Sequence, residues 1–293
     1  MRHPVAPAAL LAALSLSAVP VGFAAPGVEV QVAGYVDDAD GSSFDVAARL
    51  RPVDWLSLSI GGGQSSVSLV ASDFQGRSVR GGVDLRRGRF GAGLRASSWE
   101  DSDQFSSDIL EAELSWTFAD TLDVALRLED RRLEVDYATV GAFGRVLPQT
   151  ARFDGTGVGA RLAWYGREWS AWIDGTSYDY DARLERLVAA SRAPSTRAFP
   201  QLAVLINSVL TRTAGAIDYQ ASVGVERSFA RAWVGVDLLR SRDSVSGADS
   251  TSLGLSFRYD LSARWGVDAQ LGTIDTEGID RTGFAGLGFS FRN

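Results

Sequence analysis

The chain lacks the residues on which most hydrolytic and metal-dependent chemistry relies. Its 293 residues include no cysteine and a single histidine, His3, close to the N-terminus. The absence of Cys argues against a small secreted domain held together by disulfides. Because His3 falls in a segment that we expect to be removed, Ser–His and Cys–His nucleophile pairs and ordinary zinc sites are excluded. The sequence therefore predicts a protein that is not an enzyme and has no metal site or cofactor.

Positive charge is outnumbered by negative charge, and long apolar runs are scarce. The formal net charge of −7 argues against a nucleic-acid partner, because nucleic acids select basic patches. Beyond the first 24 residues, no apolar run approaches the roughly 20 residues that a membrane-spanning helix needs. An exported chain without such helices can still cross a membrane as a closed barrel, in which all backbone groups pair between strands.

Residues 1–24 have the pattern of a secretory signal peptide. Arg2 and His3 form a weakly positive start, and Ala8–Val19 is apolar. The sequence Gly22-Phe23-Ala24 then offers small residues at the two positions that signal peptidase reads. We expect cleavage after Ala24, which leaves residues 25–293 as one exported domain.

The stretch from Leu110 to Leu128 shows the dominant pattern of the chain. It consists of two arms, L-E-A-E-L-S-W-T-F and L-D-V-A-L-R-L, joined by A-D-T. Successive side chains of a strand point to opposite faces, so each arm has one apolar face and one charged face. The two arms therefore predict an antiparallel hairpin with a very short turn.

This alternation returns along the whole chain. It predicts an all-β fold, a transmembrane antiparallel up-and-down barrel of about 14 strands (roughly 12–16), each near the 9–11 residues that cross a bilayer obliquely. Short connections near Arg51, Arg87, Asp120, Gly166, Phe229 and Ser262 alternate with longer polar segments, including 64–77, 130–150 and 181–213. Barrels of this kind have short periplasmic turns and long extracellular loops.

Aromatic residues collect at the strand ends beside the short connections. They are Phe90, Trp116, Phe118, Trp164, Trp169, Phe257, Tyr259, Trp265 and Phe291. Amphipathic rings prefer the headgroup level of a bilayer, whereas a soluble sandwich would place its aromatic residues in mid-strand. This distribution favours a membrane barrel.

On these patterns the mature chain resembles Gram-negative outer-membrane β-barrels of the small porin type over essentially all of its length. The terminal strand A-G-L-G-F-S-F resembles the assembly signal of that class, although Arg292 and Asn293 follow Phe291. The resemblance implies a location in the outer membrane of a Gram-negative bacterium. It also implies contact with outer-membrane lipid, lipopolysaccharide and the barrel-assembly machinery.

Charged residues at alternate positions are expected to face the lumen, because a charge on the lipid face costs about 2–4 kcal/mol near the midplane. The candidate pore-lining residues are Arg49, Arg80, Asp84, Arg95, Glu111, Glu113, Asp123, Arg127, Arg161, Asp174, Glu226, Asp237, Arg258 and Asp268. Glu29, Asp45, Arg86 and Glu129 share this phase. The modest excess of acids would favour cations if the carboxylates are free. Alternatively, Arg and carboxylate side chains pair across strands and stabilise the wall.

Two loops invite a more specific interpretation. In residues 182–213 the spacing of Leu184, Leu187 and Val188 fits short amphipathic helices. Such helices would either constrict the mouth or pack on the rim. The segment Asp37–Ser43 has the acidic look of a calcium loop but lacks the downstream Glu, so a solvated hairpin turn is the better interpretation.

Together these features predict a porin-like channel for passive diffusion of small hydrophilic solutes or ions. Two alternatives stay open. One is a closed structural or interaction barrel whose external loops bind a partner. The other is an uptake channel for a small apolar compound, which would require an apolar entry pocket.

Overall fold

The computed structural model describes residues 27–38, 41–69, 72–101, 105–140, 146–181, 217–244, 247–278 and 280–293. These ranges form fourteen strands: β1 (Gly27–Asp37), β2 (Gly41–Val53), β3 (Leu56–Leu69), β4 (Ser72–Arg87), β5 (Phe90–Asp101), β6 (Phe105–Phe118), β7 (Leu122–Val140), β8 (Val146–Tyr165), β9 (Trp169–Tyr180), β10 (Ile217–Ser228), β11 (Ala232–Asp243), β12 (Asp249–Asp260), β13 (Trp265–Thr276) and β14 (Thr282–Arg292). Within the same ranges, no helix is long and apolar enough to span a membrane.

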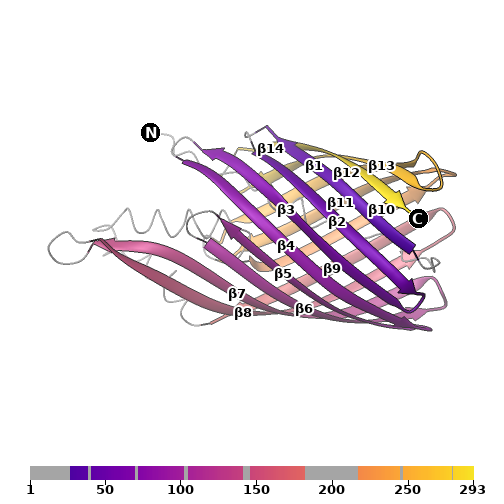
Figure 1. The fold of residues 1–293 in the computed structure, drawn as a ribbon, viewed down its shortest axis with the longest axis horizontal. Helices are drawn as coiled ribbons and strands as arrows, with labels where there is room; N and C mark the ends of the chain where they lie inside the picture. The colour runs from indigo at the N-terminus through magenta and orange to yellow at the C-terminus, as the bar shows by residue number, and fades with distance from the viewer. Residues whose placement is uncertain are drawn as a thin grey trace.

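The strands form one closed antiparallel barrel in which each strand pairs with its sequence neighbours (Figure 1). The ring closes where β1 pairs with β14, from Glu29 opposite Arg292 to Asp37 opposite Phe284. Closure removes the free edges that an open sheet would expose. The prediction of an up-and-down barrel of about 14 strands is confirmed.

The barrel is apolar outside and polar inside. Leu114 on β6 and Leu126 on β7 are direct cross-strand partners and are 67% and 63% exposed. Their neighbours in sequence, Glu113 and Arg127, point to the opposite face. A soluble protein rarely exposes such a continuous apolar surface, whereas a transmembrane barrel requires one.

The turn between β6 and β7 shows how the hairpins are closed. Ala119 and Asp120 both have positive φ, 48° and 58°, and the Thr121 amide donates to the Phe118 carbonyl at 3.1 Å. Two successive left-handed residues are the signature of a type I′ turn, whose twist matches that of the flanking strands. All six connections at this end of the barrel have two to four residues.

The aromatic residues beside these turns are grouped in contacting sets. Trp116 stacks on Phe90 and on Phe118, with ring centroids 5.4 and 4.3 Å apart. Trp265 packs against Phe291 at 4.9 Å. Phe90 is 64% exposed, as expected for a ring directed at surrounding lipid rather than at a core. This end of the barrel therefore carries the features of a membrane interface.

Two segments that the sequence predicted as loops, 64–77 and 130–150, are largely strand. β3 and β4 continue to Leu69 and from Ser72, and β7 pairs with β8 as far as Val140 opposite Val146. In Figure 1 the β7–β8 ribbon extends well beyond the rim. The loop prediction was wrong because the outward positions of these strand ends are polar, such as Arg132, Glu134 and Arg152, so the apolar outward face that marks a strand elsewhere in the chain is missing. The predicted helices of 182–213 lie outside the described residues.

The exposed apolar belt yields a direct test. Replacing Leu126 with Arg should destabilise the barrel by about 2–4 kcal/mol, because it places a charge near the middle of the lipid-facing surface. Asp130→Arg, at the polar end of the same outward row, should cost no more than about 1 kcal/mol. Unfolding by denaturant in lipid vesicles, followed by heat-modifiable gel mobility, measures both changes. Equal effects of the two substitutions would contradict the membrane assignment of this face.

Candidate functional site: the inner wall of the barrel

The structure places all fourteen candidate residues on the inner face, opposite the exposed Leu, Val and aromatic side chains. Cross-strand register brings many of them into direct opposition, such as Arg95 with Glu111 and Arg161 with Asp174. The inner face is therefore rich in charge. Whether these residues line a conducting path stays a prediction.

Arg95 on β5 holds together the carboxylates of the neighbouring strands. Its guanidinium donates to Glu111 of β6 at 2.6 Å and to Asp84 of β4 at 2.9 Å, and it lies 3.6 Å from Glu113. Glycine at position 93, directly opposite Asp84, leaves room for the Asp84 carboxylate to lie along the wall. One cation thus binds three acids without projecting towards the barrel axis.

A second cluster spans β7, β8 and β9. Arg127 donates to Asp174 at 2.8 Å and to Thr176 at 2.6 Å across the intervening strand β8. Further along β7, Arg131 donates to Glu129 at 3.1 Å and to the Tyr178 hydroxyl at 2.8 Å.

Glu129 and Arg131 are almost fully buried, with side chains 5% and 6% exposed. The Arg131 guanidinium also lies over the Tyr178 ring, 4.1 Å from its centroid. Sequence analysis missed Arg131 because 130–150 was interpreted as a loop, and it did not include Tyr178 because only charged residues were taken as candidates. The alternation of Arg127, Glu129 and Arg131 was the signal that could have found them.

The other ion pairs of the inner wall also run between different strands. They are Arg80 with Asp45, Arg86 with Asp123, Arg258 with Asp268, and Arg292 with Glu29 and Asp260. Pairing across strands, one of the two alternatives for the lumen charges, therefore describes most of the inner wall.

The side chains of four of the fourteen candidates make neither a hydrogen bond nor an ion pair with any described residue. These are Arg49, Arg161, Glu226 and Asp237. The two free carboxylates occupy neighbouring strands, β10 and β11. In this sector the two carboxylates have no hydrogen-bonded or ion-paired arginine among the described residues, so the predicted preference for cations would depend on them.

Large inward side chains lie over glycines of the adjacent strand. A Cβ on Gly224 would overlap the Trp172 ring, and one on Gly286 would overlap Tyr35. On β8, a Cβ at Gly157 would lie 2.6 Å from Cε1 of Tyr178. Glycine permits close approach at these points, so the rings lie flat against the wall rather than across the lumen.

Nothing in the described ranges forms a group of three or more His, Cys, Asp or Glu suited to a metal ion. At the described end of the acidic segment Asp37–Ser43, the Gly41 amide donates to the Asp37 carboxylate at 2.7 Å. This side chain-to-backbone bond is typical of a turn. Asp37 thus stabilises the turn between β1 and β2.

The buried ion pair on β7 offers a matched comparison. Glu129→Ala should destabilise the barrel by about 3–5 kcal/mol, because it leaves the Arg131 charge buried with one partner fewer. Glu134→Ala on the same strand breaks a pair with Arg152, whose side chain is 66% exposed, and should cost less than about 1 kcal/mol. Denaturant midpoints measured in detergent micelles compare the two. A cost below about 1 kcal/mol for Glu129→Ala would show that the pair does not stabilise the wall.

The closed barrel, its apolar exterior, its charged interior and its short turns at one end define an outer-membrane β-barrel. No family model and no curated sequence matches the chain. Among solved structures, it is similar to the CymD monoaromatic hydrocarbon channel, with 9% identity, a TM-score of 0.57, and coverage of 99% of this chain and 97% of that one.

Two further solved structures are similar with lower scores. The KdgM porin gives a TM-score of 0.43 with 9% identity, over 90% of this chain and 98% of that chain. OmpT of Vibrio cholerae gives 0.48 with 11% identity, over 91% and 96%. We base the fold assignment on the similarity to CymD and on the barrel geometry.

Proposed function

We propose that this protein is a porin-like channel through which small hydrophilic solutes or ions cross the outer membrane by passive diffusion. The observation that carries the proposal is the inner wall of the closed fourteen-stranded barrel, which is charged and whose bulky groups lie along the wall. A barrel of this size is wider than the eight-stranded kind that side chains alone can fill.

Neither alternative finds equal support. Uptake of an apolar compound needs an open greasy pocket, yet the inward apolar residues Phe105, Leu133 and Phe153 near the loop end are at most 3% exposed. Among the described residues of that end, these side chains are therefore packed and do not line an open space. A closed structural barrel would have no need of unpaired charges on its inner face, such as Glu226 and Asp237.

The finer assignments belong to the same proposal. Residues 1–24 would be a cleaved signal peptide, the barrel-assembly machinery of a Gram-negative bacterium would insert the chain, and lipopolysaccharide would contact its outer surface. A catalytic role is not part of the proposal, because the mature chain would contain neither His nor Cys. Retention of residues 1–24 in protein isolated from outer membranes would contradict the first of these assignments.

Single-channel recording in a planar bilayer tests the proposal. The purified chain should give steady conductance in KCl. Ser256→Trp should lower that conductance, because position 256 faces the lumen, whereas Leu255→Trp, on the lipid face, should leave it unchanged. The absence of conductance from correctly folded protein would favour the closed barrel, and equal effects of the two Trp variants would contradict a lumenal path.

A further inference from the structure

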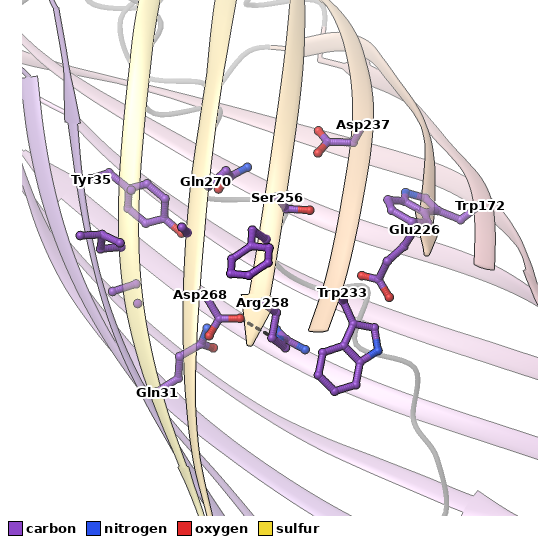
Figure 2. Close-up of a pocket in the computed structure, with 16 residues that line it drawn as sticks. Gln31, Tyr35, Trp172, Glu226, Trp233, Asp237, Ser256, Arg258, Asp268 and Gln270 are labelled. Carbon is purple, nitrogen blue, oxygen red and sulfur yellow. Dashed lines mark hydrogen bonds and ion pairs between the residues drawn. The ribbon is translucent and has the colours of Figure 1, made fainter. Parts of the chain in front are cut away.

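A cavity along the inner wall from β9 to β1 combines aromatic rings with free carboxylates (Figure 2). Its polar and aromatic lining includes Trp172, Glu226, Trp233, Asp237 and Tyr35. Arg258 also lines it and attracts Glu226 electrostatically, but it donates its hydrogen bond to Asp268. The cavity therefore contains two carboxylates that make no side-chain hydrogen bond or ion pair with a described residue, beside three aromatic side chains.

Register places these groups close together. Glu226 is directly opposite Ser170 on β9 and Gly235 on β11, so Trp172 and Asp237 lie one diagonal step away, about 7–8 Å between backbones. Trp233 is the other diagonal neighbour on β11. In Figure 2 the Glu226 carboxylate lies between the rings of Trp172 and Trp233.

Glycines in this part of the wall leave space for the side chains that line the cavity. Trp172 covers Gly224, and Asp237 lies beside Gly254 at 2.7 Å from the position of a Cβ. Because one face of the Trp172 ring rests on the backbone of Gly224, the opposite face is available to the lumen. An aromatic face next to a free carboxylate is the arrangement that binds an organic ammonium group, by cation–π attraction and direct charge.

Glu226 and Trp233 lie where two cavities of the barrel interior meet. Both residues also line a second cavity near the short turns, together with Arg86, Asp123 and Tyr165. A solute that moves from one cavity to the other therefore passes between them. The second cavity is lined by Asp120, Asp123 and Glu168 as well as by Arg86 and Arg89, so an excess of negative charge continues along this side of the wall.

We propose that Trp172, Glu226, Trp233 and Asp237 form a binding site for small organic cations that carry an ammonium group, and that this site selects such solutes during passage. The inference deepens the proposed function and rests on it for the selection step alone. Binding itself requires only the folded barrel. A neutral sugar could donate hydrogen bonds to the two carboxylates but would not offset their charge, so the charge excess favours an ammonium compound.

The test uses choline and its neutral analogue of the same shape, 3,3-dimethylbutan-1-ol. In single-channel recordings in KCl, choline should interrupt the current at concentrations where the neutral analogue does not. The double variant Glu226→Gln, Asp237→Asn should weaken the apparent choline affinity roughly tenfold, and Trp172→Leu should weaken it about three- to tenfold.

Matched controls remove the same chemical groups elsewhere. Glu277→Gln removes a carboxylate from an exposed turn, and Trp265→Leu removes an exposed ring beside a short turn, so neither should alter choline affinity. All variants are first checked for heat-modifiable mobility, and only folded protein is compared. Equal action of choline and its analogue would overturn the site. An unchanged affinity in the double carboxylate variant, or tighter binding of glucose than of choline, would do the same.

Equilibrium binding separates this inference from the channel proposal. Saturation-transfer NMR of choline with the micelle-embedded full chain reports binding whether or not the barrel conducts. Silence in KCl together with choline binding that depends on Glu226 and Asp237 would contradict the channel and support the site. Conductance without such binding would support the channel and overturn the site.

Discussion

Closure of the hydrogen-bonded ring is the constraint on which the rest of this structure depends. Hydrocarbon offers no partner to a backbone N–H or C=O, so every strand must pair on both sides. The pairing of β1 with β14 completes that requirement. Once the ring is closed, the two-residue period of the strands assigns each side chain either to lipid or to the lumen. The charged residues of the strands are thereby directed to the inner wall.

Large polar groups fit on the inner wall because each one contacts a suitable partner on a neighbouring strand. Arginines reach sideways to carboxylates of neighbouring strands, as Arg95 does, and rings lie over glycines, as Trp172 does over Gly224. Both devices hold bulky groups against the wall. They also join successive strands by side-chain contacts, which adds to the stability that the backbone ladder provides.

Pairing across strands describes one sector of the wall, and carboxylates without a paired arginine occupy another. Around β4 to β9, carboxylates are largely neutralised by arginines, and these ion pairs stabilise the wall. On β10 and β11, Glu226 and Asp237 face the lumen without such partners among the described residues. Selectivity would therefore depend on a small part of the inner surface rather than on the net charge of the protein.

The alternation of apolar and charged residues determined the fold class, the phase of each strand and the strand count, because side-chain direction follows from the strand period alone. It did not determine where strands end beyond the bilayer, since the outward positions at the ends of β7 and β8 are polar and the apolar outward face is absent there. Nor could it distinguish Glu111, held by Arg95, from Glu226, which is free. Pairing depends on register between strands and on glycines that open space beside a partner. Only the tertiary structure decides those relations.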